Sequence, residues 1–200
     1  MMDLKRSART LNWLLNAAFL FLVLRGVFAA GYHCVALYKL FTDPAALSGK
    51  MGLTIDWLTL DAERGFGISL DAAIKMKLIQ LISAAAITVI ACLAIRVLKR
   101  ILLPIEVGQP FRTGISVHIV SLSKSAFWLG LAENLSMLAS VIVIENHYDL
   151  PALLTGSTVT GVSIHPRFLP VWFIVAAVLT ILAMVFCQGE SLQQLADETL

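Results

Sequence analysis

Four long apolar runs constrain this 200-residue chain more than any other feature. A helix crosses the hydrocarbon core of a bilayer with roughly 17 to 25 mostly apolar residues. Four segments of that length are separated by polar stretches: residues 11–32, 78–98, 126–144 and 170–186. Only 14% of the residues are charged, against about a quarter in soluble domains. The sequence therefore predicts a single-domain, all-α membrane protein built as a four-transmembrane-helix bundle.

The first apolar run follows a short basic start, as in cleaved signal peptides. Arg25 interrupts this run, however, and His33 stands before Cys34 where a lipoprotein cleavage site requires a small residue. We therefore expect the run to be retained as the first transmembrane helix.

The positions of Lys and Arg predict the orientation, because short cytoplasmic loops are enriched in these residues. Positive charges lie close to the apolar runs at the N-terminus and between the second and third runs: Lys5, Arg6, Arg9, Lys99, Arg100, Arg112 and Lys124. On the opposite side they are spread along longer segments. We therefore expect a cytoplasmic loop at 99–125, a cytoplasmic tail at 187–200, and both termini in the cytoplasm. Residues 33–77 and 145–169 are then outer loops.

The two outer loops carry patterns typical of short strands. Residues Gly52 to Leu60 alternate in polarity, and Thr155 to Ile164 is rich in Thr, Ser, Gly and Val. Such segments favour extended structure. We expect the two segments to pair as a small extracytoplasmic cap, similar to a short β-hairpin.

The middle loop and the tail each contain a short motif. The first motif, Ile105–Phe111, is a turn before a helix and contains Glu106, Gly108, Pro110 and Phe111. The second motif, Phe186–Leu200, follows the last apolar run and contains Gly189, Leu192, Leu195 and Asp197. Together with the order and spacing of the four runs, these motifs resemble a bacterial multi-pass membrane family known as domain of unknown function 2975.

The resemblance covers nearly the whole chain and implies no catalytic residues. Genes for members of that family often lie beside a gene for a small helix-turn-helix regulator. The resemblance therefore implies a membrane-embedded regulator or sensor in the bacterial inner membrane, which engages a cytoplasmic partner through its middle loop and tail. In a helical tail, Leu192 and Leu195 would face one side. The neighbouring carboxylates of Glu190, Asp197 and Glu198 would attract a basic partner.

Arg25 and Glu133 are the two charges inside the predicted spans. Each costs roughly 2.5 kcal/mol or more in hydrocarbon unless it is solvated or paired. They lie at comparable depth on the predicted topology, so we expect them to form an ion pair. A pair that fixes helix packing is favoured over a proton or ion relay, because a relay requires a chain of such groups. The relay would make the protein a small transporter or channel subunit, which is the alternative function.

Residue types that bind metals gather in the outer segments: His33, Cys34, His147, Asp149 and His165. They show no local ligand spacing, so we expect no metal site. No catalytic motif is present either, and we expect neither an enzyme nor a cofactor. The net charge of +2 is too small to indicate direct nucleic-acid binding. The lipid bilayer is the expected partner of the apolar surface, and a homo-oligomer remains open.

Overall fold

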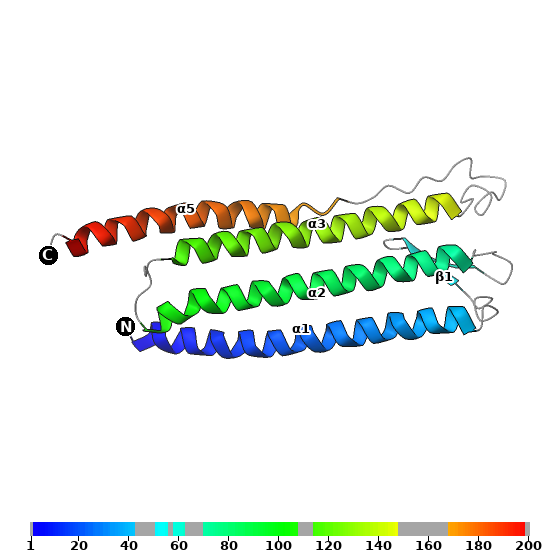
Figure 1. Ribbon diagram of the computed structural model, residues 1–200, viewed down its shortest axis with the longest axis horizontal. Helices are drawn as coiled ribbons and strands as arrows, with labels where there is room; N and C mark the ends of the chain where they lie inside the picture. Colours follow the sequence, from blue (N-terminus) through cyan, green and yellow to red (C-terminus); the bar gives the residue numbers. More distant parts are fainter. Residues whose placement is uncertain are drawn as a thin grey trace. The chain divides into compact units, whose positions relative to one another are not determined.

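The computed structural model describes residues 2–42, 51–55, 58–62, 70–107, 114–147 and 168–198. Its helices are α1 (Met2–Thr42), α2 (Leu70–Val107), α3 (Ile115–His147) and α5 (Val171–Glu198), as Figure 1 shows. Each of these four helices is long and apolar enough to cross a membrane. The predicted set of four long apolar helices is confirmed, and it indicates a multi-pass membrane protein.

The helices extend beyond the predicted spans. Helix α2 has 38 residues, or about 57 Å of helix, against a hydrocarbon thickness of about 30 Å. We expected α2 to close near Lys99 and Arg100 and Pro104 to lie in a loop, whereas Pro104 lies inside the helix. A proline removes only one helical hydrogen bond, and this one stands in the last turns, where few further bonds depend on it. Helix α5 likewise continues past Phe186 to Glu198, so the polar tail begins as helix.

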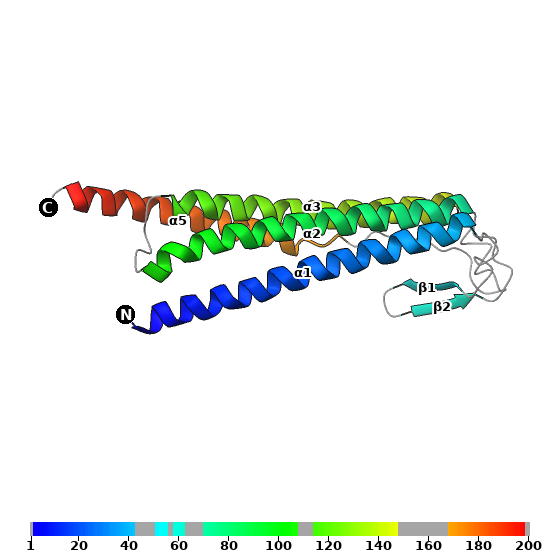
Figure 2. The ribbon, with the colours of Figure 1, turned by 60° about the horizontal axis from the view of Figure 1, so that its bottom comes forward.

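Strands β1 (Met51–Ile55) and β2 (Leu58–Ala62) form an antiparallel two-stranded sheet, drawn as two arrows in Figure 2. Met51 is opposite Ala62, and Ile55 is opposite Leu58. The single strand expected from Gly52 to Leu60 is therefore wrong, because the segment folds back on itself. A local hairpin needs much less loop closure than pairing with a distant segment. The expected partner, 155–164, lies outside the described residues.

The chain divides into two compact units, each of which we describe by itself. Unit 1 contains Met1–Val27, Ala84–Asn134 and Phe168–Leu200. Unit 2 contains Phe28–Ser83 and Leu135–Arg167.

In unit 1, α1 and α2 run antiparallel and approach closely at Gly26. A Cβ atom at this position would lie 2.5 Å from Thr88 Cγ2. The Thr88 hydroxyl donates to Ala84 O at 2.7 Å, which holds the threonine side chain in place. Further along the pair, Lys99 donates to Asn16 Oδ1. Gly26 therefore sets the distance between the two helices, because a larger residue would collide with Thr88.

The orientation can be tested with single cysteines in a chain whose three native cysteines, Cys34, Cys92 and Cys187, are replaced by serine. Asn146 at the end of α3 and Gln193 in the tail are both exposed, so labelling depends on access from outside the cell. We expect an impermeant maleimide to label Asn146→Cys in intact cells and Gln193→Cys only after permeabilisation. Equal labelling of both variants in intact cells would show that the predicted orientation is wrong.

Candidate functional site

Helix α5 lies alongside the first part of α3 in unit 1, and both Figure 1 and Figure 2 show the two helices side by side. Polar contacts fix their antiparallel register along the whole pair. Glu190 contacts Ser116, Ser123 contacts Thr180, and Asn134 contacts Leu169. Later residues of α3 therefore contact earlier residues of α5, as expected for two antiparallel helices. This α3–α5 interface is the candidate functional site.

The Glu190 carboxylate caps the start of α3. It accepts hydrogen bonds from Ser116 N at 2.8 Å, Gly114 N at 3.2 Å and Ser116 Oγ at 3.1 Å. The side chains of Glu190 and Ser116 are both buried. The first amides of a helix have no partner inside it, and its N-terminus carries positive partial charge. The carboxylate accepts hydrogen bonds from these amides and places a negative charge at the positive end of the helix. Glu190 thereby binds the tail end of α5 to the first turn of α3.

The local sequence explains why a distant residue provides this cap. Gly114, with φ of +99°, directly precedes the helix and has no side chain to accept a hydrogen bond. The first turn of α3 also contains no acidic residue. Just beyond the cap, Ile115, Ile119 and Ala183 are buried together. This apolar cluster keeps water from the neighbouring hydrogen bonds, which makes them stronger.

Small and hydroxyl side chains bring the middle of the interface together. The Ser123 hydroxyl is buried, lies 2.9 Å from Thr180 Oγ1 and donates to Ala176 O at 2.8 Å. Two turns further on, Gly130 is so close to α5 that a Cβ atom there would lie 2.9 Å from Trp172 Cβ. Close approach through small residues and hydroxyl bonds is typical of helix pairs in membranes.

Glu133 and Asn134 hold the beginning of α5. The Trp172 indole donates to Glu133 Oε2 at 2.8 Å. Asn134 Oδ1 accepts from Leu169 N at 2.9 Å, and Asn134 Nδ2 donates to Leu169 O at 3.2 Å. Asn134 thus satisfies both backbone groups of a residue that precedes the helix. Pro170 O accepts from Phe173 N and Ile174 N, both at 3.0 Å.

The structure does not bring Arg25 and Glu133 together as an ion pair. Arg25 is exposed on α1, and Glu133 is half-buried against Trp172. Both ion pairs among the described residues contain Asp71.

The motif residues of the middle loop and tail have different outcomes. Glu106 belongs to the last turn of α2, while Gly108, Pro110 and Phe111 lie outside the described residues. In the tail, Gly189 is half-buried beside Glu190, and Asp197 is helical. Leu192 and Leu195 are exposed, with 67% and 60% of their surface accessible. The tail therefore presents two large apolar side chains on a helix.

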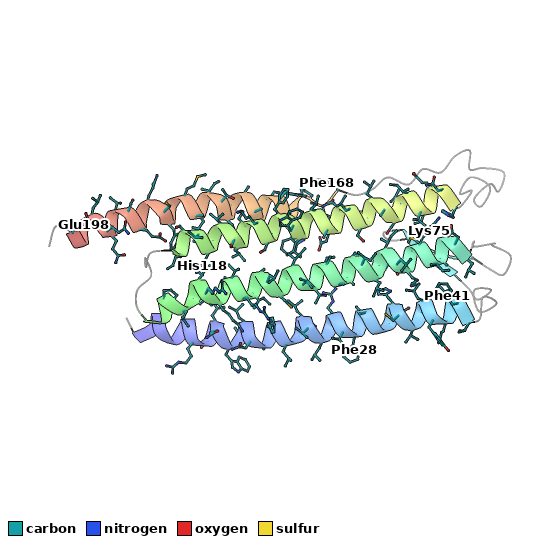
Figure 3. All side chains as sticks on the ribbon, in the orientation of Figure 1. Phe28, Phe41, Lys75, His118, Phe168 and Glu198 are labelled. Carbon is teal, nitrogen blue, oxygen red and sulfur yellow. The ribbon has the colours of Figure 1, made fainter. Side chains whose placement is uncertain are left out.

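Unit 2 contains a polar cluster between α2 and α3. Asp71 Oδ2 lies 2.5 Å from Lys75 Nζ and 3.0 Å from His147 Nε2; Figure 3 labels Lys75 near the start of α2. His147 Nδ1 lies 3.0 Å from Val143 O in its own helix. The cluster joins the beginning of α2 to the end of α3.

The metal-binding residue types are only partly described. His33 Nδ1 is buried and has no hydrogen-bond partner among the described residues, and Cys34 is exposed. His147 belongs to the polar cluster, while Asp149 and His165 lie outside the described part of the chain. Within that part, no three His, Cys, Asp or Glu side chains are placed to hold a metal ion.

Comparisons of the chain with family models, with curated proteins and with solved structures found no match. The family resemblance therefore stays a prediction.

The cap can be tested by substituting Glu190. We expect Glu190→Ala to lower the free energy of unfolding by about 1 to 2 kcal/mol, since it removes a buried cap. Glu190→Gln should lower the free energy of unfolding by a smaller amount than Glu190→Ala. Its amide oxygen still accepts hydrogen bonds, and only the negative charge is lost. Thermal denaturation of the detergent-solubilised protein measures the effect. Glu198→Ala, an exposed change in the same helix, is the control. Equal midpoints for Glu190→Ala and Glu198→Ala would contradict the capping role.

Proposed function

We propose that this protein is a membrane-embedded regulator or sensor that engages a cytoplasmic partner through its middle loop and tail. The observation that supports the proposal most strongly is the continuity of α5. The helix runs without a break from its apolar part to Glu198, which Figure 3 labels near the end of the chain. The membrane part and the polar tail are thus one rigid element.

The tail carries a surface suited to another helix. After Phe186 the sequence is mostly polar, yet Leu192 and Leu195 are exposed. Residues three apart lie on the same side of a helix. An amphipathic helix that binds in a groove uses such paired apolar anchors. The proposed contact is therefore apolar at its centre and polar around it.

The charge of the tail indicates the chemistry of the partner. Glu190 is occupied by the α3 cap, so the attraction that we first assigned to three carboxylates falls to Asp197 and Glu198. These residues favour a basic partner. A DNA-binding regulator is basic because it must neutralise phosphates, so capture by an acidic tail would compete with DNA. The family resemblance supports the same kind of partner.

The Glu190 cap supplies a route from the membrane helices to the tail. It joins the tail directly to the first turn of α3, which lies within the predicted middle loop 99–125. A shift of α3 relative to α5 would strain or break the cap and move the helical tail. The proposed regulator therefore has its signal-carrying contact at the start of α3, where Glu190 of the tail binds Gly114 and Ser116.

The proposed arrangement follows the predicted orientation, with both termini and the middle loop in the cytoplasm and the β1–β2 hairpin in an extracytoplasmic cap. The alternative role as a transporter or channel has less support. Among the described residues, Glu133 is bound by Trp172 rather than placed in a series of carboxylates. The described helices also lack the breaks that line transporter sites.

The partner contact can be tested by crosslinking and pull-down from native cells. A chain that ends after Glu190 retains the cap, so it should insert normally but lose the cytoplasmic partner. Leu192→Ser with Leu195→Ser should have the same effect in the full-length chain. Gln193→Ala with Gln194→Ala changes neighbouring exposed positions and should retain the partner. Recovery of the same proteins by the full-length and shortened chains would refute the proposal.

A further inference from the structure

Arg25 is exposed on α1 although it lies deep within an apolar helix. The candidate membrane span of α1 is Arg9–Thr42, and Arg25 is near its middle. Its neighbour Gly26 packs against Thr88, which is central in the predicted span 78–98. A hydrocarbon core about 30 Å thick places this level about 15 Å from either surface. Charged side chains at such depth are rare and almost always face protein or water.

The face of α1 that contains Arg25 has the spacing of a helix-packing seam. Its residues alternate by three and four positions, and all are exposed: Leu11, Leu14, Ala18, Phe21 and Arg25. This spacing is that of the core positions of a coiled coil, where a single polar residue fixes register and oligomeric state. The four apolar residues of this face could equally well contact lipid. Arg25 distinguishes this face from a lipid-facing one.

Glu133 lies close to the same depth in unit 1. Ile101 of α2 packs against the cluster that contains Ile115 and Ile119 of α3. Counted from Ile101, Thr88 is about 20 Å away along α2. Counted from Ile119 and Ile115, Glu133 is about 21 to 27 Å away along α3, which runs antiparallel to α2. Arg25 and Glu133 thus differ by less than about two helical turns in depth. Among the described residues, Trp172 is the one side chain that donates to Glu133, so the carboxylate can accept further hydrogen bonds.

We propose that a second copy of this chain covers the Arg25 face of α1 and pairs its own Glu133 with Arg25. Opposite charge and matched depth identify the partner. A lipid phosphate is a weaker candidate, because an arginine at this level would have to cross most of one leaflet to reach it. The proposal is independent of the tail and its cytoplasmic partner.

A charge-swap experiment separates pairing between copies from pairing within one chain. Two differently tagged chains, Arg25→Glu and Glu133→Arg, are produced together and separately, extracted in mild detergent and tested for co-purification. Each variant alone brings like charges together, so its self-association should fall about tenfold. The mixture restores opposite charges at both contacts, and it should co-purify as well as two wild-type chains.

The other outcomes overturn the proposal. Pairing within one chain leaves both variants mismatched, so the mixture would show no recovery. Contact with lipid alone predicts that wild-type copies do not co-purify. Arg25→Leu, which introduces no new charge, must also reduce self-association at an unchanged membrane level. As a control, Arg100→Glu reverses an exposed positive charge on a different helix, α2, and it must leave self-association unaltered.

Discussion

The carboxylate of Glu190 at the start of α3 is the contact on which the α3–α5 pair depends. A helix that follows a glycine has no side chain at that position to cap it, and its first amides need acceptors wherever water is scarce. Glu190 reaches them across 74 residues of sequence. Because the cap accepts from two backbone amides and a hydroxyl, it fixes both the position and the rotation of α5. The other contacts of the interface follow from that register.

From this fixed end, the two helices approach through small residues. Ser123 and Gly130 offer no bulk that would separate them, and hydroxyl bonds replace the hydrophobic driving force that lipid removes. Asn134 closes the far end by binding the backbone of Leu169. The same logic applies at Gly26 and Thr88, where α1 meets α2. Charge is rare in the apolar parts of the helices, and the exposed Arg25 therefore supports the proposed contact with a second copy.

The sequence was sufficient for the number, order and type of the helices, because runs of spanning length admit few other structures. It was not sufficient for their ends, since polar helix beyond the bilayer resembles loop by composition, as Pro104 and the tail after Phe186 illustrate. The sequence indicates extended structure in the segment that forms β1 and β2, but it suggests one strand with a distant partner instead of a local hairpin. From the sequence, Glu190 is expected to attract a basic partner, because a cap supplied by another helix leaves no local pattern. The glycine before α3 and the acid-free first turn were the available signals.

Hydrogen exchange tests the coupling between the α3 start and the tail most directly. The wild-type protein and Glu190→Ala are compared in lipid nanodiscs, with peptides that cover residues 114–119 and 187–198. The account predicts that both segments lose protection together in Glu190→Ala, while residues 126–144 exchange as in the wild type. Unchanged exchange in the tail, with a loss confined to the first turn of α3, would contradict it.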